Sequence, residues 1–236
     1  MTLTVCLQGK DGIVVASDSR GTFGDPRGIT AQNDTMRKLY LIRNVGILQA
    51  GSTQGNMIID EAKRICEGKN INDVTRIMEK VRETAKRRFD EWFNAFPLYP
   101  SPDNPTFMRP QLTLSVAGYD FESNGTSIPR MYSMTSNIDF APTFHDFGFV
   151  LAGVAQYALY LLNRLYSSDM DMEALKHLAA YVITETAAQD GKVGGPVQMG
   201  AITDKSANIL KSEDILNIIK GNENKTNELK GLFRRK

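Results

Sequence analysis

The chain contains 236 residues, of which 42% are apolar, and its formal net charge at pH 7 is +1. A chain of this length fits one large domain with a sizeable hydrophobic core. The near-zero charge argues against a protein that binds nucleic acid or a membrane surface. The sequence has no long apolar run and no basic segment leading into an apolar one, which argues against membrane insertion and export. We therefore expect a cytoplasmic location.

Two strand pairs open the chain. Residues Thr2 to Gln8 and Ile13 to Ser17 have apolar strand patterns, and Lys10-Asp11-Gly12 between them suits a tight turn. A second pair follows, formed by Lys38 to Ile42 and Gly46 to Ala50. The sequence therefore predicts four strands, in two hairpins, before any helix.

After Gly51 the apolar period changes from that of a strand to that of a helix. Ser52 is the expected N-cap of a first helix, and either Asn72 or Asp73 is the expected N-cap of a second. Two consecutive helices would then cover one face of a sheet. Their apolar positions are Met57, Ile58, Ile59, Ala62 and Ile65, then Val74, Ile77, Met78, Val81, Ala85, Phe89 and Trp92.

The segment Phe96 to Pro110 carries five of the nine prolines and is expected to be a long surface loop. Beyond it we expect strands over Leu112 to Tyr119, Arg130 to Thr135 and Phe147 to Leu151, helices over Val154 to Tyr166 and Met172 to Ala188, and a strand over Val197 to Thr203. This order lacks the strand–helix alternation of a parallel sheet. It predicts an α+β fold with four αββα layers, in which two antiparallel sheets lie between helix pairs.

We expect residues 1–220 to form a single domain and the charged segment 221–236 to be a tail that is frayed or docked on a partner. Cys6 and Cys66 have no second thiol or histidine at metal-ligand spacing, so we expect both to be buried thiols. No metal or other cofactor is expected.

Thr2 raises the question of function, because a threonine hydroxyl needs an adjacent base to act as a nucleophile. The two histidines, His145 and His177, lie in a turn-like segment and inside a helix pattern, without an elbow-type serine or cysteine motif. An α-amine has a reference pKa of about 7.7 to 8.0 and can serve as the base. If Met1 is removed, Thr2 supplies nucleophile and base together.

The opening segment TLTVCLQGKDGIVVASDSRGT resembles the first hairpin of proteasome β-type subunits, which are N-terminal-nucleophile hydrolases. Weaker likeness extends along most of the chain to Val197. The resemblance implies that Asp18 pairs with Lys38, that Lys38 keeps the terminal amine neutral, that the Gly51 N–H forms the oxyanion hole, and that Asp190 helps to hold the amine.

The resemblance also implies a groove for an extended polypeptide substrate, with which the backbone of Thr22 would pair. It implies a pocket for the side chain before the scissile bond, for which we predict a neutral, medium-sized apolar preference. The matching positions are Gly21, Met36, Tyr40, Gln49 and Thr53.

Two positions depart from the family pattern. Where family members commonly carry a serine in a Gly-Ser-Gly turn, this chain reads Leu151-Ala152-Gly153-Val154, and Val193 stands where another serine precedes the Gly-Gly pair. In the family these hydroxyls help to orient the terminal amine and its proton-carrying water.

Three functions therefore remain open. A threonine peptidase would release the acyl-enzyme with water, a peptide ligase would release it with another peptide's amine, and a scaffold subunit would keep only the fold. The presence of Thr2, Asp18 and Lys38 together argues against the scaffold. The resemblance further implies a homo-oligomeric ring with an ATP-driven unfoldase as a further partner, and neither nucleic acid nor membrane is expected to bind.

Overall fold

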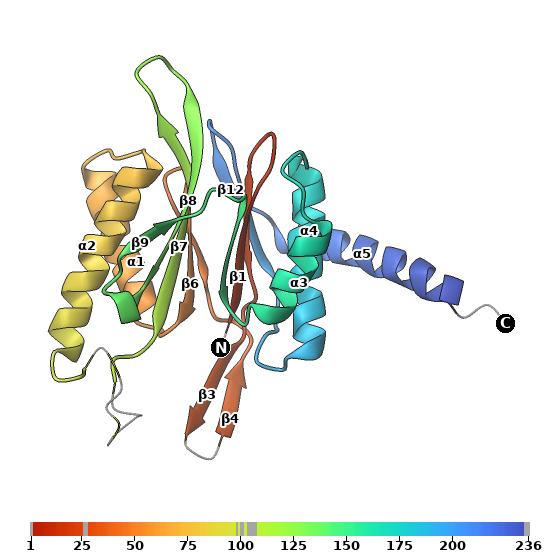
Figure 1. Cartoon of the computed structure of the whole chain (residues 1–236), viewed down its shortest axis with the longest axis horizontal. Coiled ribbons are helices and arrows are strands. Elements are labelled where there is room, and N and C mark those ends of the chain that lie inside the picture. Colours follow the sequence, from red (N-terminus) through yellow and green to blue (C-terminus); the bar gives the residue numbers. More distant parts are fainter. Residues whose placement is uncertain (1, 26–27, 98, 100–101, 103–107, 234–236) are drawn as a thin grey trace.

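The computed structural model describes the whole chain except residues 1, 26–27, 98, 100–101, 103–107 and 234–236. The described part forms four layers, with two antiparallel sheets packed face to face between two helix pairs (Figure 1). The predicted α+β class and the αββα sandwich are confirmed.

The first sheet is built around the predicted N-terminal hairpin. Its inner strands alternate strictly: Leu3, Val5 and Leu7 face one helix pair, whereas Cys6 faces the other sheet. Both faces are buried, which explains the nearly continuous apolar sequence. The strand order is β10-β1-β2-β11-β12, with β1 at Leu3–Gln8, β2 at Ile13–Ser17, β10 at Phe149–Gly153, β11 at Gln198–Ile202 and β12 at Ala207–Ile209.

The second sheet contains the second predicted hairpin and the strands after the proline-rich segment. Its order is β5-β6-β7-β8-β9, so each strand pairs with its neighbours in sequence. A short 3-10 turn, η1 at Ser136–Ile138, joins its last two strands. The strands are β5 at Leu39–Ile42, β6 at Val45–Gly51, β7 at Leu112–Phe121, β8 at Ser127–Thr135 and β9 at Pro142–Phe144.

Four helices cover the outer faces of the sheets. Helices α1 (Gly55–Gly68) and α2 (Val74–Phe93) pack on the second sheet, and α3 (Gln156–Leu165) and α4 (Met172–Gln189) pack on the first. Cys6 and Cys66 are both buried and free, as predicted. A third apolar cluster fills the space between the two sheets and contains Cys6, Ile13, Val15, Leu39, Leu48, Ala117, Met131, Val150 and Ile202.

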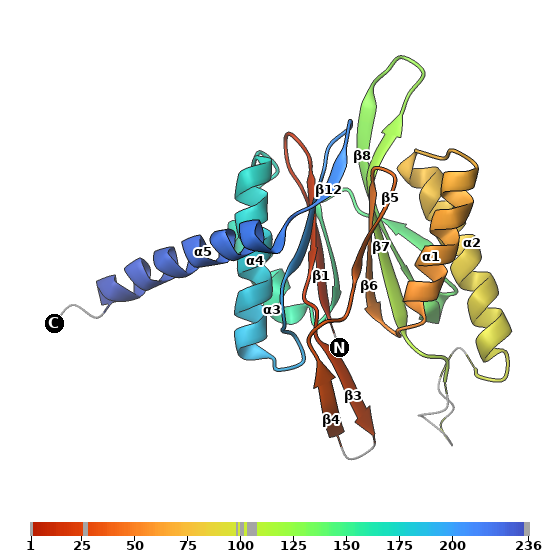
Figure 2. The same ribbon diagram turned by 180° about the vertical axis from the view of Figure 1, so that it is seen from behind.

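The prediction of four strands before the first helix was wrong, because the structure has six. Between β2 and β5 lies an additional hairpin, β3 (Gly21–Asp25) with β4 (Gly28–Asn33), which extends beyond the sandwich (Figure 2). Its two strands pair only with each other, with an irregular register after Phe23. Glycine and proline interrupt the strand pattern there, which explains why the sequence did not indicate it.

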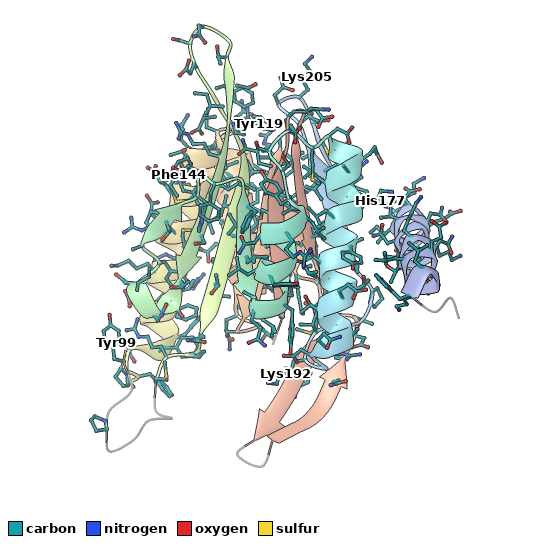
Figure 3. The ribbon with its side chains drawn as sticks, turned by 45° about the vertical axis from the view of Figure 1, so that its right-hand side comes forward. Tyr99, Tyr119, Phe144, His177, Lys192 and Lys205 are labelled. Atoms are coloured by element: carbon teal, nitrogen blue, oxygen red, sulfur yellow. The ribbon has the colours of Figure 1, made fainter. Side chains whose placement is uncertain are left out.

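The charged C-terminal segment is a helix rather than a frayed tail. Helix α5 spans Ser212–Phe233, so the boundary predicted at residue 220 falls inside it. Asn222 docks it on α4, since its amide contacts the His177 ring at 2.8 Å and donates to the His177 carbonyl at 2.9 Å (Figure 3). An ideal Cβ on Gly221 would lie 3.4 Å from the His177 ring. The lack of a side chain at Gly221 therefore permits this close approach.

The predicted helix caps differ in detail. The N-cap of α1 is Gln54 rather than Ser52, whose hydroxyl bonds the Gln54 side chain instead. The N-cap of α2 is Asp73, one of the two residues predicted, but its carboxylate makes no cap bond and accepts from Phe121 N at 3.4 Å. Much of the predicted loop 96–110 lies outside the described residues. None of the described helices has the length and apolarity required to cross a membrane.

Candidate active site

Thr2 lies immediately before β1 and is only 5% exposed. Its carbonyl oxygen accepts a hydrogen bond from Val154 N at 2.8 Å, at the end of β10. Leu3 is also held, because its carbonyl accepts from Asp18 N at 3.2 Å. The start of the chain is therefore fixed between the ends of two strands.

Asp18 and Lys38 form a buried ion pair beside this position. Asp18 directly follows β2, Lys38 directly precedes β5, and the Lys38 ammonium lies 2.7 Å from Asp18 Oδ1. The side chains are 0% and 5% exposed, respectively. The same Asp18 oxygen accepts from Leu3 N at 3.0 Å, so it links Lys38 directly to the backbone that follows Thr2.

Every oxygen of the Asp18 carboxylate has two donors. Oδ2 accepts from Arg20 N at 3.2 Å and from Gly194 N at 3.1 Å, in addition to the two donors on Oδ1. The Lys38 ammonium also donates to the Arg20 carbonyl at 2.6 Å. A buried charge that is paired and hydrogen-bonded in this way costs far less than an isolated one.

Burial lowers the pKa of Lys38 from its usual value. The attraction and hydrogen bond of Asp18 oppose this shift, as does the charge of Asp34, but desolvation is the larger effect. Lys38 also lines the same pocket as Thr2. A cation at this place disfavours a second positive charge on a nearby amine.

Gly51 ends β6 with a φ of +101°, a backbone conformation that favours glycine. An ideal Cβ there would lie 2.3 Å from the Gln111 carbonyl oxygen. Gln49 N donates to Lys38 O at 3.0 Å, and alternate residues of a strand direct their N–H groups to the same side. The Gly51 N–H therefore points to the same edge of β6 as the Gln49 N–H, which is the edge that faces β5. Gly51 lies beyond the first residue of β5, so its N–H is directed toward the pocket.

The pocket brings most of the predicted substrate-binding residues together. It encloses about 60 Å³ and is lined by Gly21, Thr22, Met36, Gln49 and Thr53, together with Thr2, Phe23, Lys38 and Gly51. Tyr40 was predicted to line it as well, but the structure places Tyr40 elsewhere. Its ring lies in the core under α1, 4% exposed, where its hydroxyl donates to Asn56 at 2.7 Å.

Asp190 is the C-cap of α4, where its N–H donates to Thr186 O at 2.9 Å, and its side chain contacts the loop that follows. Its carboxylate accepts from Lys192 N at 2.9 Å, and its carbonyl accepts from Val193 N at 3.0 Å. Asp190 does not line the Thr2 pocket in the part of the chain that the structure describes. Val193 is fully buried among apolar residues, so the position of the expected serine is occupied by core packing.

Arg20 joins the Asp190 loop to the β3–β4 hairpin, which sequence reasoning did not predict. Its guanidinium makes a bidentate pair with Asp34, at 2.7 and 2.8 Å, and donates to Gly191 O at 3.0 Å. Gly194 lies directly against this guanidinium, since an ideal Cβ on Gly194 would be 2.6 Å from the guanidinium carbon of Arg20. Lys192 of the same loop lies at the base of the hairpin in Figure 3.

Gln198 at the start of β11 is a second residue that sequence reasoning missed. Its side-chain oxygen accepts from Lys38 N at 3.0 Å and Leu39 N at 3.2 Å, and its amide donates to Met36 O at 2.6 Å. It therefore fixes the segment that carries both Lys38 and the pocket residue Met36. The available signal was a lone glutamine in an otherwise apolar strand.

The two histidines lie away from Thr2, in line with their predicted structural roles. His145 contacts the Ser133 hydroxyl at 2.8 Å, and burial lowers its pKa. His177 binds Asn222 of α5. Among the described residues, no cluster of three or more His, Cys, Asp or Glu side chains has an arrangement that could hold a metal ion.

Comparisons with known proteins find similarity in sequence and in fold. No protein-family model matches the chain. The chain is 25% identical over 228 residues to the proteasome subunit beta 1 of Korarchaeum cryptofilum strain OPF8, covering 93% of this chain and 96% of that protein.

Two solved structures of Anbu, the ancestral beta-subunit, share the fold. The protein from Yersinia bercovieri superposes with a TM-score of 0.70 at 16% identity, over 99% of this chain and 97% of that one. The Gly-1 mutant from Hyphomicrobium sp. strain MC1 gives 0.67 at 16% identity, over 100% and 98%. Together these similarities show that the chain shares the fold of the two Anbu structures and is similar in sequence to a proteasome beta subunit over most of its length.

Proposed function

We propose that this protein is a threonine peptidase of the proteasome β type, in which Thr2 becomes the terminal nucleophile after Met1 is removed. The observation that carries the proposal is the buried Asp18–Lys38 pair, which is linked through Leu3 N to the backbone of Thr2 and whose lysine lines the Thr2 pocket. A structural role alone does not require a desolvated lysine next to a terminal threonine.

In the proposed reaction the free α-amine of Thr2 takes the hydroxyl proton while Oγ attacks the substrate carbonyl. The Lys38 ammonium keeps that amine neutral by electrostatic repulsion, and Asp18 holds the ammonium in place. The Gly51 N–H donates to the oxyanion, a contribution of about 10²- to 10³-fold in rate. The amine then protonates the leaving nitrogen, and water releases the acyl group by the reverse path.

The substrate in this proposal is an extended polypeptide. Thr22 on β3 supports backbone pairing, as in strand addition to a sheet edge. The small volume near Gly21 and Met36 and the neutral side chains of Gln49 and Thr53 support a neutral, medium-sized apolar residue before the scissile bond. The names of the relatives describe subunits, which supports assembly into a larger complex. The proposal adds that this complex is a homo-oligomeric ring in the cytoplasm, served by an ATP-driven unfoldase.

A peptide ligase is the second candidate. Gly153 and the buried Val193 stand where hydroxyls would position a hydrolytic water, so the acyl-enzyme would persist long enough for an amine to capture it. Asp190, whose carboxylate accepts from Lys192 N of its own loop, is proposed to hold the amine only if that loop shifts after Met1 is removed.

Two measurements test the proposal. The intact mass of the purified protein should correspond to the chain without Met1, and a retained Met1 would block the amine and favour a scaffold. Product analysis with a peptide library should then show Thr2-dependent cleavage in the wild type and none in Thr2→Ala. Adding a competing amine separates the two candidates, since a ligase yields the amide and a peptidase yields the acid.

A further inference from the structure

Arg20 and Asp34 stand at the two ends of the β3–β4 hairpin, which extends beyond the sandwich (Figure 2). Arg20 directly precedes β3, which begins at Gly21, and Asp34 directly follows β4, which ends at Asn33. Their side chains form a bidentate pair, in which Arg20 Nε and Nη2 lie 2.7 and 2.8 Å from the two Asp34 carboxylate oxygens. The pair therefore closes the base of a hairpin whose strands pair only with each other.

The backbone of Asp34 binds the same segment a second time. Its carbonyl accepts from the Ser19 hydroxyl at 2.7 Å, and the Ser19 carbonyl accepts from Met36 N at 3.0 Å. Gly195 packs against both sides of this contact, since an ideal Cβ on it would lie 2.5 Å from the Ser19 hydroxyl oxygen and 2.9 Å from Asp34. The turn that carries Asp34 is thus packed directly on the segment that carries Arg20.

The backbone of Arg20 connects the hairpin base to the Lys38 ammonium. The Arg20 carbonyl accepts from Lys38 Nζ at 2.6 Å, and the Arg20 N–H donates to Asp18 Oδ2 at 3.2 Å. Among the residues that the structure describes, the other acceptor of the ammonium is Asp18 Oδ1. A shift of the Arg20 backbone would therefore move one of the two oxygens that hold the Lys38 charge beside Thr2.

The exposure of the Arg20–Asp34 pair indicates what the pair contributes. The two side chains are 21% and 42% exposed, respectively. An ion pair in contact with water adds little to stability, because water solvates both charges and screens their attraction. A bidentate pair with a planar guanidinium nevertheless fixes direction, since both hydrogen bonds form in one geometry. We therefore expect the pair to set the position of atoms more than the free energy of unfolding.

The charge of Asp34 also acts on Lys38. Burial is the main cause of the lowered pKa of Lys38, but the Asp34 charge raises this pKa, whereas the Arg20 charge lowers it. Asp34 thus offsets the repulsion that Arg20 exerts on the ammonium. Without the Asp34 carboxylate, the Arg20 guanidinium would disfavour the charged form of Lys38.

We infer that Asp34 is a positioning residue for the reaction of Thr2, and that it acts through Arg20. It holds the Arg20 carbonyl that orients the Lys38 ammonium, and it holds the start of β3, on which Thr22 is proposed to pair with the substrate. The inference rests on the proposed function. Asp34 itself does not line the Thr2 pocket in the described part of the chain, so its effect is indirect.

The test measures modification of Thr2 by an electrophile that forms a ring with its hydroxyl and its amine. The electrophile is attached either to an acetyl group or to a short extended peptide. The rate constant at saturation reports on Lys38 and the amine, and the half-saturating concentration reports on peptide binding. Asp34→Asn should lower the rate constant about tenfold with both electrophiles, and should raise the half-saturating concentration of the peptide electrophile alone.

Two further variants separate positioning from a loss of folding. Asp34→Glu keeps a carboxylate that can reach the Arg20 guanidinium and should restore most of the lost rate. Asp90→Asn is the matched control, because Asp90 pairs with Arg109 at 2.8 Å in an ion pair of similar exposure and does not line the Thr2 pocket. Its rate should equal that of the wild type. The denaturation midpoints of Asp34→Asn and Asp90→Asn should be alike.

The outcomes that contradict the inference differ from those that contradict the proposed function. A wild-type rate in Asp34→Asn, a loss that Asp34→Glu does not restore, or an equal loss in Asp90→Asn would each overturn the role of Asp34 and leave the peptidase intact. A midpoint of Asp34→Asn far below that of Asp90→Asn would also overturn it, by assigning the effect to folding. Absence of any Thr2 modification in the wild type would refute the proposed function and this inference with it.

Discussion

The two sides of Thr2 are built differently. On one side, Asp18 and Lys38 form a buried ion pair in which each Asp18 oxygen has two donors. On the other, Gly153 at the end of β10 has no side chain, and an ideal Cβ on it would lie 1.8 Å from the Thr2 carbonyl oxygen. The Asp18–Lys38 pair implied by the resemblance is formed, whereas the Asp190 carboxylate accepts from Lys192 N, and the segments in which family members carry serines have no serine here.

This difference separates two requirements of the proposed chemistry. Keeping a terminal amine neutral requires a nearby cation, which Lys38 provides. Guiding a water to the acyl-enzyme requires positioned polar groups, and the side of Gly153 offers an open cavity instead. Within the proposed function, formation of an acyl-enzyme is therefore better supported than its hydrolysis. The substitutions below act on one side or the other.

The largest effect on folding is expected when the ion pair is broken. Lys38→Met leaves Asp18 buried without its counter-ion and should lower the free energy of unfolding by about 3 to 5 kcal/mol. Chemical denaturation measures this. The double variant Asp18→Asn/Lys38→Met should lose less than the sum of the two single losses, and additive losses would show that the two side chains do not interact.

A somewhat smaller loss is expected on the other side of Thr2. Gly153→Ser adds a hydroxyl in the segment where family members carry a serine but forces Cβ into the Thr2 carbonyl, so it should cost about 3 kcal/mol. Gly125→Ser is the control, since Gly125 has a similar φ of +85° and no atom within 4 Å of its ideal Cβ. Equal losses in the two variants would mean that the contact with Thr2 is unimportant.

Gln198 should matter less, because its hydrogen bonds are neutral. Gln198→Met removes one donor and one shared acceptor from the segment before β5 and should lower the free energy of unfolding by about 2 kcal/mol. It should also slow modification of Thr2, which Gln156→Met on the exposed face of α3 should not. If Thr2 is modified at the normal rate in a folded Gln198→Met protein, Gln198 does not contribute to the site.

The smallest effect is the pH dependence that Lys38 confers. Because burial lowers its folded-state pKa below the unfolded value of 10.5, the unfolded chain binds more protons in the interval between these two values. The free energy of unfolding of the wild type, relative to Lys38→Met, should therefore rise with pH across that interval. A difference that falls with pH would mean that Asp18 outweighs burial and raises the pKa.

The sandwich could be predicted because its signals are local. Strands β1 and β2 alternate between two buried faces, and α1 and α2 bury residues at helical spacing, as Ile58, Ala62 and Ile77 do. The ends of β2 and β5 then bring Asp18 and Lys38 together. The family resemblance supplied their expected roles, which periodicity alone did not.

The features that the sequence did not reveal depend on long-range contacts. The β3–β4 hairpin has weak strand propensity and is anchored by Arg20 and Gln32 on Gly191, which is distant in the chain. The charged sequence of α5 predicts a tail, whereas the structure shows that Asn222 docks this helix on His177. The family resemblance implied that Tyr40 lines the pocket, whereas its ring packs in the core under α1.

The central claim is that Thr2 carries both the attacking hydroxyl and the accepting amine. An electrophile that forms a ring with both groups of a terminal threonine tests it directly, with the adduct located by peptide mapping and mass spectrometry. The account predicts one adduct on Thr2, preserved in Thr2→Ser, absent in Thr2→Ala and slowed in Lys38→Met. Unchanged labelling of Thr2→Ala, or a wild-type chain that keeps Met1 and gives no adduct, would contradict it.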